Sequence, residues 1–273
     1  MKRRVGLGLS KTSRVSLKEF ESLNLLTPSS KHESSHGASQ TTRGRLRVSE
    51  TFTSRQGEGI LTGTPSFFIR TTGCNLRCWF CDTPYASWTP KGEQIPLQSL
   101  VEQAQKSGVK HVVLTGGEPM LAKAISPLTD LLHRAGFHLT IETAGTIHRD
   151  VQADLLSISP KFASSTPHAS KHPKWHERHE TQRLRTGTLQ KLIDGAQDYQ
   201  LKFVVDSSQD YAELLKLIEE LNLDRSKVWV MPQGSTEDAL DRATYWLKPW
   251  CEQQGFHYCE RMQIRWYGNR RGT

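Results

Sequence analysis

Short apolar runs alternate with amphipathic segments along most of the chain, and each kind of segment predicts a different element. In residues 96–108, for example, Leu97, Leu100, Val101 and Ala104 recur at helical spacing. Helices are predicted over residues 96–108, 122–135, 209–221 and 236–253. Strands are predicted at residues 65–72, 110–119, 138–143, 154–159, 201–206 and 227–233. Because strand and helix alternate, the pattern indicates parallel βαβ units in an α/β fold.

Residues able to do chemistry follow the ends of these strands. They are the cysteines after residue 72, Gly116-Gly117, Glu142-Thr143, Ser159-Pro160-Lys161 and Gln233. In a parallel barrel or part-barrel the carboxyl ends of the strands share one face, where active sites are built. We therefore expect a parallel barrel or part-barrel that carries its site on that face.

The net charge of +8 is concentrated at the beginning of the chain. Residues 1–49 contain ten Lys and Arg against three Asp and Glu, a charge of +7, so the other 224 residues carry +1. This distribution does not favour nucleic acid as a partner of the body of the protein. Residues 1–49 are also rich in Ser and Thr, which predicts a disordered extension before a domain at residues 50–273. A dispensable extension is the favoured interpretation, and an organellar targeting peptide is the alternative.

Cellular setting can also be argued from the sequence. No apolar run approaches the ~18 residues that span a bilayer, so we expect no membrane partner. The charged start is not followed by the apolar region of a secretory signal. Five cysteines, three of them clustered, favour a reducing compartment, and we expect a cytoplasmic protein.

The stretch "GCNLRCWFCDT" at residues 73–83 holds Cys74, Cys78 and Cys81. A structural zinc site uses four protein ligands, and Cys251 and Cys259 lie far away in the sequence. An iron–sulfur cluster held by three thiolates leaves one iron open to a small molecule. The spacing therefore favours a 4Fe-4S cluster, with a zinc site or unrelated thiols as the alternative. Cys251 and Cys259 are expected to be buried or inert thiols.

The C-x3-C-x2-C pattern followed by Asp82, together with "TGGEP" at residues 115–119, resembles the radical S-adenosylmethionine (SAM) superfamily. The resemblance implies a partial barrel of the radical SAM type. It also implies that SAM binds the open iron and yields a 5′-deoxyadenosyl radical. The glycines would let the backbone approach the cofactor closely. Glu118 is expected to be structural rather than catalytic.

A narrower resemblance covers residues 50–273. The stretches that carry it are "ETFTSRQGEG" (50–59), "FFIRTTGCNLRCWFCDT" (67–83), "IETAG" (141–145), "ISPK" (158–161) and "WYGNRRGT" (266–273). They are similar to 7-carboxy-7-deazaguanine synthases, lyases of queuosine and deazapurine biosynthesis. Such enzymes convert 6-carboxy-5,6,7,8-tetrahydropterin to 7-carboxy-7-deazaguanine with loss of ammonia. The resemblance further implies Mg²⁺. A flavodoxin or ferredoxin is the expected reductant, and a homodimer is expected because dimers are the commonest oligomers.

Site residues follow from the same resemblance. The cluster would be bound by Cys74, Cys78 and Cys81, and magnesium by Thr83. SAM would be bound by Phe80, Cys81, Asp82, Gly117, Ser159, Pro160, Lys161 and Gln233. The substrate would be bound by Arg55, Gln56, Gly57, Glu58, Arg70, Thr115 and Thr273, the last through the terminal carboxylate.

Chemistry supports some of these assignments and leaves others open. Arg70 directly precedes the cysteine loop, and a guanidinium can bind a carboxylate bidentately, although a surface salt bridge is the alternative. Lys161 is either a cofactor ligand or a solvated lysine. Phe80 stands where the family often has Trp, which leaves the residue that stacks on the cofactor open.

A histidine-rich stretch, "HASKHPKWHERH" at residues 168–179, fits no part of this resemblance. His172, His176 and His179 recur at helix-like spacing. A solvated basic insertion near the mouth of the site is the favoured interpretation. A second metal site is the alternative, because imidazole is a common ligand.

Two functions from other classes compete with the synthase. An enzyme that activates a glycyl radical on a partner protein would share the cysteines and "TGGEP" but would not need "QGEG" or "WYGNRRG". A non-catalytic iron–sulfur or zinc module would lack "TGGEP" and the alternation of strands and helices. The sequence therefore favours the synthase.

Overall fold

The structure is a computed structural model that describes residues 44–273. The extension predicted for the start of the chain, with its alternative as a targeting peptide, lies outside the described residues as far as residue 43. The strands are β1 (Arg45–Arg55), β2 (Pro65–Thr71), β3 (Glu93–Pro96), β4 (His111–Gly116), β5 (His138–Thr143), β6 (Leu155–Ile158), β7 (Tyr199–Val205), β8 (Val228–Pro232) and β9 (His257–Tyr258). The α-helices are α1 (Pro84–Ser87), α2 (Leu97–Lys106), α3 (Ile125–Arg134), α4 (Pro173–Gln182), α5 (Thr186–Gly195), α6 (Asp210–Glu220), α7 (Glu237–Gln254) and α8 (Met262–Tyr267).

All these strands join one sheet in the order β3-β1-β2-β4-β5-β6-β7-β8-β9. β1 pairs antiparallel with both β2 and β3, whereas every neighbouring pair from β2 to β9 is parallel. The two ends of the sheet, β3 and β9, do not pair with each other, so the sheet is open. This arrangement confirms the predicted α/β partial barrel.

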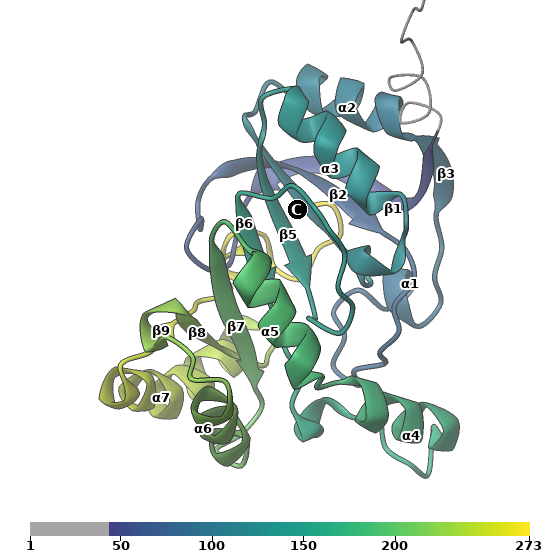
Figure 1. Cartoon of the computed structure of the whole chain (residues 1–273). Helices are drawn as coiled ribbons and strands as arrows, with labels where there is room; N and C mark the ends of the chain where they lie inside the picture. The colour runs from purple at the N-terminus through teal and green to yellow at the C-terminus, as the bar shows by residue number, and fades with distance from the viewer. Residues whose placement is uncertain (1–43) are drawn as a thin grey trace, which may run out of the picture. The chain divides into compact units, whose positions relative to one another are not determined.

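Every helix and strand predicted from the hydrophobic pattern is present within a few residues of its expected bounds. The reason is visible in α2, where Leu97, Leu100, Val101 and Ala104 are all buried. Figure 1 shows α2, α3 and α5 covering one face of the sheet, while the C-terminal segment returns to the middle of the sheet. No helix in the described part of the chain is long and apolar enough to cross a membrane.

The predicted start of the domain, residue 50, lies inside β1. β1 already begins at Arg45, because Leu46 and Val48 are each only 2% exposed and pack into the main core. Both residues also pair with β3. Arg45 and Arg47 hid this strand, since they make the segment resemble the basic stretch that precedes it.

Candidate active site

A cavity of about 480 Å³ opens at the carboxyl ends of the parallel strands. The β1–β2 hairpin, the cysteine loop, the ends of β4, β5 and β8, and the last residues of the chain all contribute to its lining. This volume lies in the range of ligand-binding pockets. Among the predicted site residues all but Pro160 line it: Arg55, Gln56, Gly57, Glu58, Arg70, Cys74, Cys78, Phe80, Cys81, Asp82, Thr83, Thr115, Gly117, Ser159, Lys161, Gln233 and Thr273. Pro160 is buried next to the lining residues.

The cysteine loop connects β2 to α1 and is held by backbone hydrogen bonds. The Gly73 N–H donates to the Ala86 carbonyl at 2.7 Å, and the Glu118 N–H donates to the Gly73 carbonyl at 2.9 Å. A Cβ added at Gly117 would lie 2.1 Å from the Gly73 carbonyl oxygen. The glycine turn after β4 therefore packs directly against the cysteine loop, and only glycine fits there.

The donor set of this loop fits an iron–sulfur cluster. Burial, with the negative charges nearby, raises the pKa of Cys74 to about 12 and that of Cys78 to about 11. Such thiols ionise when they bind a metal, because the positive charge of the metal offsets both the burial of the thiolates and the repulsion from nearby negative charges. No group of three His, Cys, Asp or Glu side chains in residues 44–273 converges on a single ion. Thiolates of a cluster bind separate irons, so they do not need to converge in that way.

Glu118 belongs to the scaffold of the site. Its carboxylate is 1% exposed and accepts hydrogen bonds from Met120 N, Thr143 Oγ1 and Ala144 N at 2.8–3.0 Å. These bonds tie the turn after β4 to the end of β5. The arrangement agrees with the structural role expected for this residue.

Lys161 is not a solvated lysine. Its Nζ donates to the carbonyl and to the hydroxyl of Ser159, both at 2.6 Å, and burial lowers its pKa. Both side chains line the cavity beside Cys78. This position places a cation next to the cysteine loop.

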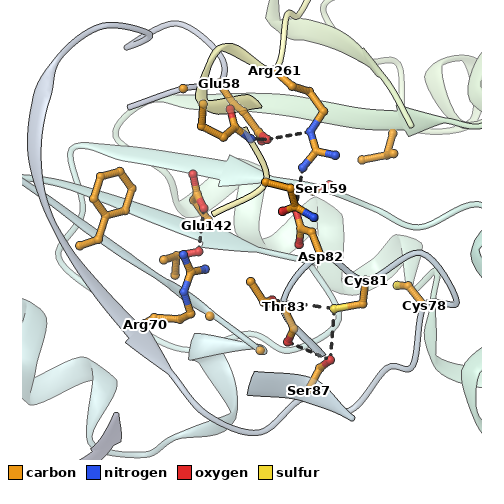
Figure 2. A pocket seen from close by; sticks show the side chains of 18 of the residues that line it. Glu58, Arg70, Cys78, Cys81, Asp82, Thr83, Ser87, Glu142, Ser159 and Arg261 are labelled. Carbon is orange, nitrogen blue, oxygen red and sulfur yellow. Dashed lines mark hydrogen bonds and ion pairs between the residues drawn. The ribbon is translucent and has the colours of Figure 1, made fainter. Parts of the chain in front are cut away.

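A network of charges joins the predicted SAM side of the cavity to the predicted substrate side (Figure 2). Arg261 donates from Nη2 to Asp82 Oδ2 at 2.6 Å and from Nε to Glu58 Oε1 at 3.4 Å. Lys202 forms a salt bridge with the other oxygen of Glu58. Burial alone would raise the pKa of Glu58, but the charges of Lys202 and Arg261 outweigh it and lower the pKa to about 2. Neither cation was predicted, although a lysine within the apolar run "LKFVVD" was a signal.

Arg70 lines the cavity and also forms the salt bridge that was its alternative interpretation. Its Nε donates to Glu50 Oε1 at 2.7 Å. Glu50 accepts two further bonds, from Tyr85 OH at 2.8 Å and from Arg271 Nε at 2.7 Å. Glu50, Tyr85 and Arg271 were not predicted as site residues. They hold Arg70 in place and fasten the C-terminal segment to β1.

Glu142 is a further residue of the cavity that the sequence placed near the site without a role. It accepts from Thr115 Oγ1 at 2.7 Å and from Gln56 Nε2 at 3.1 Å. Figure 2 shows the Glu142 side chain between those of Glu58 and Arg70. Glu142 and two predicted site residues, Gln56 and Thr115, thus form one hydrogen-bonded polar side of the cavity.

Thr83 follows the last cysteine of the loop and lines the cavity. Its hydroxyl lies 3.8 Å from Cys81 Sγ, and Ser87 Oγ lies 3.1 Å from the same sulfur. These hydroxyls are hard oxygen donors next to the predicted cluster.

The prediction of a solvated insertion is wrong for His179. This residue of α4 is 0% exposed, accepts from the Arg77 N–H at 3.1 Å and contacts Ser165 Oγ at 2.9 Å. Its burial lowers its pKa to about 4, which keeps the imidazole neutral. The insertion is therefore anchored to the cysteine loop.

The two cysteines outside the loop, Cys251 and Cys259, are buried as expected.

Comparison with known proteins agrees with this geometry. Residues 68–241 match the model of the radical SAM superfamily, so the chain is a radical SAM enzyme. It is 53% identical over 237 residues to the 7-carboxy-7-deazaguanine synthase of Rhodopirellula baltica, covering 87% of this chain and 92% of that protein. It is 42% identical over 230 residues to the synthase of Halobacterium salinarum, covering 80% and 89%. The chain belongs to the 7-carboxy-7-deazaguanine synthase family.

Solved structures give the same result. The crystal structure of QueE from Escherichia coli matches with a TM-score of 0.61 at 25% identity, covering 82% of this chain and 99% of that one. Neither a glycyl-radical activating enzyme nor a non-catalytic metal module is favoured by these similarities. The prediction of the family from sequence motifs is confirmed.

Proposed function

We propose that the cavity converts 6-carboxy-5,6,7,8-tetrahydropterin to 7-carboxy-7-deazaguanine, with loss of ammonia. The observation that supports this most strongly is the shared lining. The three cysteines, the glycine turn and the residues of the β1–β2 hairpin face one cavity, as a radical generated beside its substrate requires. The reaction serves deazapurine biosynthesis, including queuosine.

Cys74, Cys78 and Cys81 would hold a 4Fe-4S cluster, which together with SAM supplies a 5′-deoxyadenosyl radical for hydrogen abstraction. The residues proposed to bind SAM are Phe80, Cys81, Asp82, Gly117, Ser159, Pro160, Lys161 and Gln233. Asp82 is oriented by Arg261, and Lys161 by its two bonds to Ser159. The partly buried cation of Lys161 suits the anionic end of the cofactor.

Arg70 would bind the carboxylate of the substrate. Its Nε is engaged by Glu50, which leaves the terminal nitrogens of the guanidinium for a planar bidentate contact. Arg55, Gln56, Gly57, Glu58, Thr115 and Thr273 would surround the rest of the molecule. Glu142 is held by Gln56 and Thr115 as an acceptor for the guanidine-like edge of the pterin.

Magnesium is proposed to bind at Thr83 and to orient the substrate, because hard oxygen donors and retained water suit this ion. We further propose a flavodoxin or ferredoxin as the reductant, a homodimer, and a cytoplasmic location. The net charge of residues 50–273 is only +1, which gives no reason to propose a nucleic acid partner.

The role of Arg70 can be tested by replacing it with methionine, which removes the charge and keeps much of the apolar stem. A charge-assisted bidentate contact predicts that KM for the pterin rises by about ten- to a hundredfold. Formation of 5′-deoxyadenosine without substrate should persist. Arg265→Met is the matched control, because Arg265 is also ion-paired, to Asp241 and Glu260, but does not line the cavity. An equal KM in the two variants would contradict the role of Arg70.

A further inference from the structure

Arg77 lies within the cysteine loop, between Cys74 and Cys78, and is only 7% exposed. Its Nη1 donates to the carbonyls of Cys74 and Leu76, both at 2.7 Å. The guanidinium is therefore folded back against the backbone of the loop that presents the thiols. Its position is fixed by the same loop that it would influence.

This buried cation has no carboxylate to balance it. In residues 44–273 no Asp or Glu oxygen lies within 4.0 Å of its nitrogens, and its buried Nε has no hydrogen-bond partner. Arg70 and Arg261 differ in this respect, because Arg70 pairs with Glu50 and Arg261 pairs with Glu58 and Asp82. An uncompensated buried charge is unfavourable, and it points to an anion that completes the site.

Two aromatic rings hold Arg77 and keep water away from it. Its Cζ lies 3.9 Å from the centroid of the Trp175 ring and 6.0 Å from that of Trp88. Trp175 belongs to α4, the part of the histidine-rich insertion that the reaction does not use. The helix is joined to the loop at the same place, since His179 accepts from the Arg77 N–H. Cation–π contacts of this kind gain strength when they are desolvated.

We propose that Arg77 is the fixed counter-cation of the iron–sulfur cluster and raises its reduction potential, with α4 shielding this charge from water. The proposal rests on the proposed function, because it requires a cluster on the three cysteines. A cluster held by three thiolates is anionic and becomes more negative on reduction. A nearby buried positive charge stabilises the reduced form more than the oxidised form, and low local polarity strengthens the effect. Arg77 is thus a positioning residue that acts through the cluster.

The test is a redox titration of the cluster in the reconstituted full-length chain, followed by electron paramagnetic resonance. Arg77→Gln removes the charge while it keeps N–H donors for the two carbonyls. At a fixed potential we expect the ratio of reduced to oxidised cluster to fall about tenfold, which corresponds to about 59 mV for one electron. In Arg77→Lys the ratio of reduced to oxidised cluster at the same potential should stay within about a factor of two of the wild-type ratio, because the charge is retained.

Arg178→Gln is the matched control. Arg178 lies 5.0 Å from the same Trp175 ring, but it is exposed, so solvent and salt screen its charge. We expect no shift in this variant. Trp175→Leu is a second variant, which leaves Arg77 in place and admits water to it, and its potential should shift in the same direction as that of Arg77→Gln by a smaller amount.

Each outcome has a defined meaning. If wild-type protein forms no reducible cluster, the assignment of the cofactor fails before Arg77 is tested. If Arg77→Gln loads a cluster with the wild-type potential, or shifts no further than Arg178→Gln, the proposal is wrong. Should Arg77→Gln fail to load iron, loading by Arg77→Lys would support a need for the charge. Failure of both variants would show that the guanidinium acts through its hydrogen bonds and would overturn the proposal.

Discussion

The carboxylate of Glu58 is bound by side chains from two distant parts of the sequence. Lys202, Arg261 and Gln263 all reach it, and the two cations fix it in the ionised form. A carboxylate so held can accept hydrogen bonds from a ligand but does not transfer protons near neutral pH. At the scale of single residues, the strap "QGEG" is therefore a preorganised acceptor rather than an acid or base.

Replacing Glu58 with glutamine should destabilise the fold by about 3–5 kcal/mol, because Lys202 is left buried without its carboxylate partner and Arg261 keeps only Asp82. The pH dependence should change as well. The folded pKa of about 2 lies below the ordinary value of 4.5, so this carboxylate stabilises the fold above about pH 4.5. That contribution is lost as the pH falls toward 2.

Denaturant unfolding at several pH values measures both effects. Between these limits the wild type should lose stability more steeply than Glu58→Gln. Glu177→Gln, on the exposed side of α4, is the control and should behave as the wild type. Parallel curves for wild type and Glu58→Gln would exclude the assigned ionisation.

Arg261 illustrates what single-residue reasoning from sequence cannot reach. The chain motif around Asp82 indicated a cofactor contact, but its partner lies 179 positions further along. Only the fold brings β8, α8 and the cysteine loop to one place. The family resemblance predicted Glu58 and Arg70, whereas the side chains that orient them, Lys202 and Glu50, depend on strand register.

At the scale of elements, α4 turns from an unexplained insertion into a support for the cysteine loop. Its sequence "PKWHERHETQ" is polar on most sides, so periodicity gave no sign of a buried face. Within this contact, one neutral imidazole bridges the Arg77 N–H and Ser165 Oγ. In contrast, α2 and α3 were predicted well because each carries a broad apolar stripe.

His179→Ala should cost about 1–3 kcal/mol, because it leaves a buried N–H without an acceptor. It should also flatten the pH dependence of stability. Since the folded pKa of about 4 lies below 6.5, neutral His179 stabilises the fold above about pH 6.5 and this is lost as the pH falls toward 4. His111 titrates in the same window, so the variant is compared with the wild type.

Thermal unfolding between these pH values, with iron content after reconstitution, checks the role of α4. His176→Ala is the matched control, because His176 lies three positions earlier on α4 and its ring is hydrogen-bonded to the Pro167 carbonyl rather than to the cysteine loop. We expect lower iron content in His179→Ala alone. Equal losses in the two variants would indicate that α4 contributes to general stability and not to the cysteine loop.

At the scale of the whole molecule, alternation of strand and helix predicted parallel βαβ units with one functional face, and the family resemblance predicted the partial barrel. The edges were harder to predict. β1 and β3 pair antiparallel at one end, and their charged alternating sequence resembles exposed loop. The motif of the C-terminal segment suggested that it reaches the cavity. Its attachment to Glu50 through Arg271 could be seen only in the structure.

One reaction tests the proposed function. The anaerobically reconstituted chain is incubated with SAM, magnesium, a reductant and 6-carboxytetrahydropterin, and the products are identified by mass spectrometry. We expect 7-carboxy-7-deazaguanine and ammonia from wild-type protein and no product from Cys78→Ala, which lacks one cluster ligand. Formation of 5′-deoxyadenosine without 7-carboxy-7-deazaguanine would contradict the assigned substrate, and an intact cluster that yields neither compound would contradict radical SAM chemistry at this site.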